Sequence, residues 1–169
     1  EWLGALATAG ILPYAPADRR YSLPPEHAAA LTGPTSSNQA PRAAMATLLG
    51  RNLDGIEKAF RHGGGVPYAA FAPDFTGVMD ALHRRPTDEL LVDHWLPVAP
   101  GLVERLRAGA RVADVGCGTG HAVNVLAAAF PSSRFTGYDL STDAITRARE
   151  EAAGQGLTNA DFVVADLVG

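Results

Sequence analysis

Three alternate glycines in the middle of the chain constrain its fold more than any other feature. Gly116, Gly118 and Gly120 follow the apolar residues Val112, Ala113 and Val115 and precede a helical pattern that ends near Phe130. Glycine lacks a Cβ atom and accepts positive φ, so such a loop can turn sharply and expose its backbone to a ligand. The following helix adds free N–H groups. This order predicts a buried parallel strand, covered on both faces, with a nucleotide-type cofactor at its carboxyl end.

The glycine spacing argues against two common nucleotide sites. In the dinucleotide fingerprint Gly-x-Gly-x-x-Gly/Ala, the third position would fall on His121 or, read from Gly118, on Val123. Both side chains are too large for the close helix–strand contact made at that position. No Gly-Lys-Ser/Thr follows the loop, so a P-loop is excluded.

Acidic residues stand at the ends of three consecutive predicted strands. Asp114 is on the first strand, Asp139 ends the strand predicted over 134–138, and Asp166 ends the strand predicted over 162–165. Asp139 follows the first glycine by about 20 positions, where a carboxylate accepts hydrogen bonds from ribose hydroxyls. The combined pattern is more specific than the glycines alone.

The spacing Asp114-x-Gly-x-Gly-x-Gly resembles the first motif of class I S-adenosylmethionine-dependent methyltransferases. The resemblance implies an α/β fold with a Rossmann-like, doubly wound sheet, of which residues 110–169 hold the first three strands. It also implies S-adenosyl-L-methionine as the cofactor. Methyl transfer to an unidentified small-molecule acceptor is the expected activity, with positioning and exclusion of water as the protein's main contribution.

The resemblance also implies roles for individual residues. Asp114 would orient the donor's amino group, Asp139 would hold the ribose hydroxyls, and Asp166 would meet the adenine amine. Leu140 would pack against adenine. The backbone of the glycine loop would line the methionine and ribose part of the cofactor; its residues are Gly116, Cys117, Gly118 and Gly120.

Residues 1–31 read as helix, strand, turn and strand, which is the second half of a winged-helix unit. The helix offers no basic side chain to a DNA groove, and only Arg19 and Arg20 lie near the wing. We therefore expect a packing module that forms a homodimer, as the resemblance implies. A ligand-responsive DNA-binding regulator and a nucleotide-dependent oxidoreductase remain the alternatives.

Residues 32–109 read as a helical connecting region that opens with a linker over 33–41. An apolar stripe at intervals of three and four predicts one amphipathic helix over 43–62. We expect this stripe to pack in the core; its members are Met45, Leu49, Leu53, Ile56 and Phe60. A helix starting at Pro73 or Asp74 should end before Pro86, and Thr87 should cap the next one.

Candidate acceptor and catalytic residues also lie in this region. Tyr68 and Phe71 follow a glycine-rich break and could form a lid or wall of a pocket, or belong to a simple connector. His94 is a weak candidate for a catalytic base; a partly buried histidine with satisfied hydrogen bonds is the favoured interpretation. The histidines show no metal-ligand spacing, so no metal site is expected.

The composition and net charge exclude or disfavour several classes of protein. The net charge of −4 and the lack of a basic run disfavour a nucleic-acid partner. One cysteine excludes an internal disulfide, and no run of about 18 apolar residues predicts a membrane span. A reducing cytoplasm is the default location. Because the chain starts with Glu1 and stops just past the third strand, we expect a fragment of a longer protein.

Overall fold

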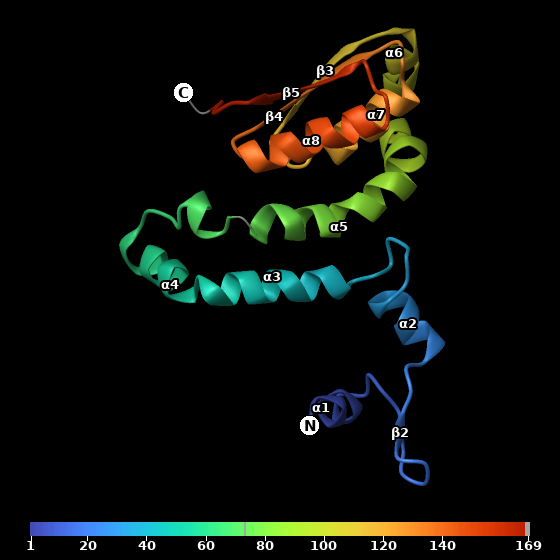
Figure 1. The fold of residues 1–169 in the computed structure, drawn as a ribbon, viewed down its shortest axis with the longest axis vertical. Coiled ribbons are helices and arrows are strands. Elements are labelled where there is room, and N and C mark those ends of the chain that lie inside the picture. The colour runs from blue at the N-terminus through green and yellow to red at the C-terminus, as the bar shows by residue number, and fades with distance from the viewer. Residues whose placement is uncertain (73, 168–169) are drawn as a thin grey trace.

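The computed structural model describes residues 1–72 and 74–167. Its three-stranded parallel sheet has the order β3-β4-β5, formed by Arg111–Val115, Arg134–Asp139 and Ala160–Val164. Helices α7 (His121–Ala129) and α8 (Thr142–Gly154) connect the strands and lie on the same face of the sheet (Figure 1). Because all three strands run in the same direction, their carboxyl ends meet at one edge. The predicted α/β fold class is confirmed.

The hydrophobic core lies between this sheet and its two crossover helices. Phe135 and Phe162 from the strands pack with Val123 of α7 and Ile145 of α8, and each is 5% exposed or less. The sheet's other face has no such cover within the described residues, and Val115 is 67% exposed. The expectation that β3 is covered on both faces is therefore wrong for the described structure.

The predicted helix over 43–62 is two helices, α3 (Ala40–Arg51) and α4 (Leu53–His62). They meet at Asn52, where φ of −105° and ψ of 10° interrupt the helix and the side-chain amide donates to the Leu48 carbonyl. The predicted stripe is largely exposed, with Leu53 at 61% and Phe60 at 88%. Core packing of the stripe is therefore wrong, because α3 buries only Leu48 and no described element covers Phe60.

Helix α5 (Asp74–Leu90) continues through Pro86 instead of ending before it, and Pro73 lies outside the described residues. Thr87 is buried within the helix and is not an N-cap. Proline removes the N–H that would bond the carbonyl four residues earlier. Arg84 and Asp88, on either side of Pro86, contact Glu151 of α8 and His121 of α7.

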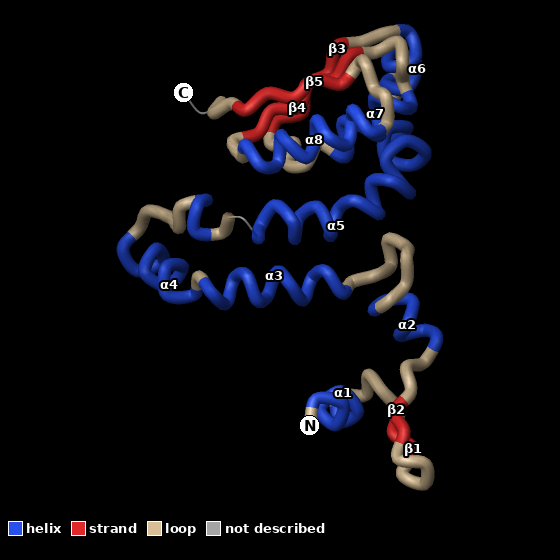
Figure 2. Tube along the Cα trace, viewed as in Figure 1, coloured by secondary structure: helices blue, strands red, loops and turns tan. Residues whose placement is uncertain are grey.

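A π-helical turn, η2 (Leu91–Trp95), and a 3-10 turn, η3 (Leu96–Val98), lead from α5 to the short helix α6 (Leu102–Ala108). Helix α6 ends with Gly109 as its C-cap and directly precedes the sheet. Figure 2 shows α5 lying between α3 and the sheet with its crossover helices. This position places α5 beside the edge where the strands end.

The N-terminal residues form α1 (Trp2–Thr8), the antiparallel pair β1 (Tyr14–Ala15) and β2 (Arg20–Tyr21), and α2 (Pro25–Leu31). The element order matches the prediction, although each strand is only two residues long. This module lies at the opposite end of the molecule from the sheet (Figures 1 and 2). Within the described part of the chain, no helix has the length and apolar character needed to cross a membrane.

Candidate functional site

The glycine loop is tied by its backbone to the carboxyl end of β4. The N–H groups of Gly116 and Cys117 both donate to the Tyr138 carbonyl, at 2.8 and 3.0 Å. The Gly118 N–H donates to Asp139 Oδ2 at 2.8 Å. Gly116 and Gly118 have φ of 80° and 55°, and a Cβ on either would meet nothing within 4 Å. Both positions therefore need glycine for backbone conformation and leave open space beside the main chain.

Gly120 has a different role. A Cβ there would lie 2.4 Å from the Phe162 ring and 2.6 Å from the Ala148 Cβ, and φ is 69°. The residue is buried and does not line the cavity beside the loop. Gly120 therefore lets the start of α7 pack closely on α8 and β5, rather than presenting backbone to a ligand.

A cavity of about 530 Å³ opens at the carboxyl ends of the strands. The glycine loop and the segments after β4 and β5 form one side of it, and α5 with the 3-10 turn η1 (Tyr68–Ala70) forms the other. Seven of the predicted site residues line this cavity. They are Gly116, Cys117, Gly118, Asp139, Leu140, Asp166 and Tyr68.

The other predicted site residues lie outside the cavity wall. Besides Gly120, these are Asp114, Phe71 and His94. The ring of Phe71 packs edge-on against Phe75, 6.4 Å away. His94 is exposed in η2 and does not line the cavity. The favoured interpretation of His94 as a partly buried histidine is therefore wrong.

Asp139 is fixed at the cavity wall by two backbone hydrogen bonds. Its Oδ2 accepts from Gly118 N–H, and its Oδ1 accepts from Ser141 N–H at 2.8 Å. A carboxylate oxygen accepts about two hydrogen bonds, so both oxygens keep capacity for hydroxyl donors. Burial, and next the charge of Asp139, raises the pKa of the neighbouring Asp114 carboxyl. The two acids therefore create a site that favours a bound cation.

The Cys117 thiol is packed and protonated. Burial, followed by the charges of Asp114 and Asp139, raises the pKa of Cys117 to about 12. Its sulfur lies over Gly137, where a Cβ would be only 2.7 Å from it. Since the thiolate is the reactive form, Cys117 is not a nucleophile at neutral pH.

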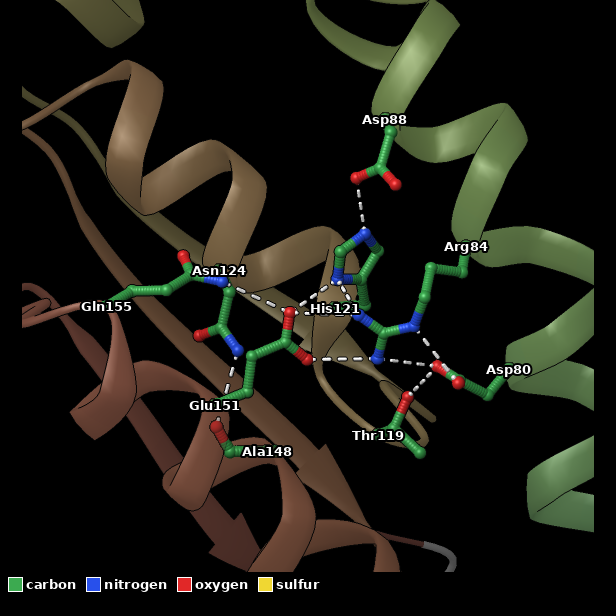
Figure 3. A network of polar contacts seen from close by, with 9 residues as sticks. All are labelled: Asp80, Arg84, Asp88, Thr119, His121, Asn124, Ala148, Glu151 and Gln155. Atoms are coloured by element: carbon green, nitrogen blue, oxygen red, sulfur yellow. Dashed lines mark hydrogen bonds and ion pairs between the residues drawn. The ribbon is translucent and has the colours of Figure 1, made fainter. Parts of the chain in front are cut away.

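The cavity wall on α5 was missed by sequence reasoning. It includes two residues that bond other helices or the loop, Asp80 and Arg84, together with Met79, His83 and Thr87. Thr119 Oγ1 donates to Asp80 Oδ1 at 2.6 Å, and Arg84 donates to both carboxylate oxygens of Glu151 at 3.0 Å (Figure 3). The four-residue spacing of Asp80, Arg84 and Asp88 is readable in the sequence, but their partners lie 30 or more residues away.

Two parts of the chain match known domain families. Residues 106–168 match the family described as "Methyltransferase domain", and residues 1–33 match the "Rv2258c-like winged HTH domain". A trans-aconitate 2-methyltransferase of Paracidovorax citrulli is 42% identical over 62 residues, which cover 37% of this chain and 22% of that protein. The S-adenosylmethionine-dependent methyltransferase resemblance and the winged-helix expectation are confirmed.

Solved structures agree on the fold. An O-methyltransferase family protein from Burkholderia thailandensis matches with a TM-score of 0.70 at 17% identity, over 99% of this chain and 49% of its own. The mitomycin 7-O-methyltransferase MmcR matches with a TM-score of 0.66 at 20% identity, over 97% of this chain and 50% of its own. The chain therefore spans about half the length of these structures and about a fifth of the curated relative.

Proposed function

We propose, from the premise that this chain carries a methyltransferase domain of the S-adenosylmethionine-dependent type, that its cavity binds S-adenosylmethionine for transfer of the methyl group to a small-molecule acceptor. The observation that supports this most strongly is the joint position of the glycine loop and Asp139. The loop exposes backbone at Gly116 and Gly118, and its own hydrogen bond holds the Asp139 carboxylate at the same cavity wall.

The roles proposed for the cavity residues follow from their positions. Asp139 accepts hydrogen bonds from the ribose hydroxyls, Leu140 packs against the adenine, and Asp166 meets the adenine amine. Gly116, Cys117 and Gly118 line the methionine and ribose part with backbone. Asp114, outside the wall, contributes negative charge toward the donor's amino group and sulfonium.

The reaction needs little covalent help from the protein, because the sulfonium methyl is intrinsically reactive. The chain's own contribution is to orient the donor and acceptor at attack distance and to exclude water. The acceptor is proposed to enter beside α5 and Tyr68, which form the wall facing the glycine loop. His83 and His121 line the cavity and His94 does not. Asp88 and Glu151 hold His121, so His83 is the histidine that we propose takes a proton from a bound acceptor.

Calorimetry with S-adenosylhomocysteine tests the proposal. Asp139→Ala should weaken binding by about 1.5–3 kcal/mol, the usual contribution of hydrogen bonds to a charged group. Asp161→Ala is the matched control, because Asp161 is an exposed acid on the same sheet, away from the cavity. Binding of NAD in place of S-adenosylhomocysteine would support the oxidoreductase alternative instead.

A further inference from the structure

Helix α5 carries two adjacent sets of residues with different neighbours. Met79 and His83 line the cavity, and Asp80 and Arg84 line it as well. Asp80, Arg84 and Asp88 follow one another at four-residue intervals and contact the glycine loop, α8 and the start of α7 (Figure 3). Residues four apart lie on one side of a helix, so the second set forms a continuous stripe, here called the ionic stripe.

Arg84 is the centre of the ionic stripe. It donates to both oxygens of Glu151 on α8 at 3.0 Å and to both oxygens of Asp80, at 2.9 and 3.1 Å. Asp80 in turn accepts from the Thr119 hydroxyl within the glycine loop. One guanidinium therefore links α8, α5 and the loop in a fixed bidentate geometry.

His121, the first residue of α7, completes the network. Its Nε2 lies 2.6 Å from Asp88 Oδ1, and its Nδ1 lies 2.6 Å from Glu151 Oε1. The imidazolium donates to both carboxylates. Nδ1 is also 2.7 Å from Arg84 Nη1, so a neutral ring protonated on Nε2 accepts from Arg84 instead. The start of α7 is therefore bonded to α5 in either charge state of the ring.

The contact between His121 and Glu151 is shielded from solvent more than an ordinary surface pair, whereas Arg84 and Asp88 are 35% and 50% exposed. The His121 and Glu151 side chains are 11% and 18% exposed, whereas Arg147 and Asp143, another ion pair on α8, are 52% and 63% exposed. An exposed pair contributes little because water screens it, while a shielded pair with bidentate geometry holds its partners in place. The network thus joins the loop, α7 and α8 to the helix that forms the opposite cavity wall.

We propose that the ionic stripe is a positioning device for the cofactor loop. Through Thr119 and His121 it holds the glycine loop and the first turn of α7 in the conformation that binds the cofactor, and it sets the distance of the α5 wall from that loop. The inference rests on the proposed function, because it takes the cavity to be the cofactor site. Glu151, which does not line the cavity, is a positioning residue that acts through Arg84 and His121.

The test compares Glu151→Gln with Glu150→Gln in the full chain, using S-adenosylhomocysteine as the probe. Both substitutions remove one negative charge from α8, but Glu150 is exposed and makes no hydrogen bond or ion pair within the described residues. Glu151→Gln should raise the Kd roughly three- to thirtyfold, the range for residues that act on a site through their neighbours. Glu150→Gln should leave the Kd within about twofold.

Thermal unfolding of the ligand-free variants separates positioning from general stability. The Kd is measured where every variant is fully folded, so a loss of affinity there supports positioning. Equal affinities for Glu151→Gln and Glu150→Gln, with normal binding by the wild type, would overturn it. A wild type that binds no S-adenosylhomocysteine would instead overturn the proposed function.

Thr119 provides a second, uncharged variant. Thr119→Val removes the hydroxyl that donates to Asp80 and leaves the side-chain volume nearly constant. Thr119→Ser keeps the hydroxyl. The valine variant should lose affinity and the serine variant should recover most of it. Thr119→Val and Glu151→Gln should also be less than additive, because both act through the same network. Full additivity would contradict a shared positioning role.

Discussion

At the scale of single residues, Gly118 and Gly120 have separate roles although they are only two positions apart in the sequence. Gly118 lines the cavity and has free space where a Cβ would be, whereas Gly120 is enclosed by Phe162 and Ala148. Alternate glycines predicted the loop correctly. Gly120 packs against α8 and β5 instead of lining the cavity, and local spacing cannot reveal such distant neighbours.

Substitution of the two glycines should separate stability from binding. Gly120→Ala should lower the free energy of unfolding by about 2–4 kcal/mol, from overpacking together with positive-φ strain. Gly118→Ala should cost about 1 kcal/mol of stability from its φ alone and should weaken S-adenosylhomocysteine binding. Urea unfolding and calorimetry on both variants measure these effects. Equal destabilisation by the two substitutions would contradict the packing role of Gly120.

Substitution of Asp114 tests how its negative charge affects stability and cofactor binding. Its pKa is raised in the folded state, so its ionisation costs stability, and that cost grows as pH rises through the raised pKa. Asp114→Asn should therefore raise the melting temperature of the ligand-free protein at pH 7 and have little effect below the ordinary carboxyl pKa of about 3.9. It should also weaken S-adenosylhomocysteine binding. A lower melting temperature at pH 7 would show that the Asp114 charge is compensated.

At the scale of elements, the parts that sequence reasoning predicted best were those governed by local patterns. The sheet strands and helix α7 are specified by apolar runs and glycines. The burial of α3 and α4 could not be predicted in this way. A periodic apolar stripe says which face of a helix is apolar, but only its neighbours decide whether that face is covered.

The effect of the proline in helix α5 could not be predicted from the local sequence either. Pro86 predicted a helix end, yet the helix continues through it, and Arg84 and Asp88 on either side contact α8 and α7. Pro86→Ala should therefore restore a helical hydrogen bond and raise the free energy of unfolding by about 1–3 kcal/mol. Chemical denaturation measures the change. A destabilised variant would mean that the proline ring itself supports the bend or packing of α5.

The stability that the ion pairs between α5 and α8 contribute should depend on pH. Burial opposes ionisation of Glu151 and Asp80, but hydrogen bonds from Arg84 and from His121 or Thr119 outweigh it and lower the pKa of each carboxyl. A lowered carboxyl pKa gives stability that is present above the unfolded pKa and is lost as pH falls through the folded one. Unfolding free energy should therefore fall as pH drops below about 4.5, and Glu151→Gln should reduce that slope relative to Glu150→Gln.

At the scale of the whole molecule, the described chain leaves large apolar side chains exposed outside the cavity wall. Trp2 of α1 is 72% exposed, and Leu53 and Phe60 of α4 are 61% and 88% exposed. Such surface is typical of association sites. We propose that the N-terminal module packs against a second copy, in keeping with the expected homodimer. Light scattering should give a dimer for the wild type and a shift toward monomer for Trp2→Glu; an unchanged dimer would exclude α1 from the interface.

The central claim is that the adenosyl cofactor binds between the glycine loop and α5. A crystal structure of the full chain with S-adenosylhomocysteine tests it most directly. We predict ribose hydroxyls within hydrogen-bond distance of Asp139, adenine beside Leu140, and the ionic stripe of α5 intact across the cavity. Density for the ligand at another surface, or a bound ribose that makes no contact with Asp139, would contradict the account.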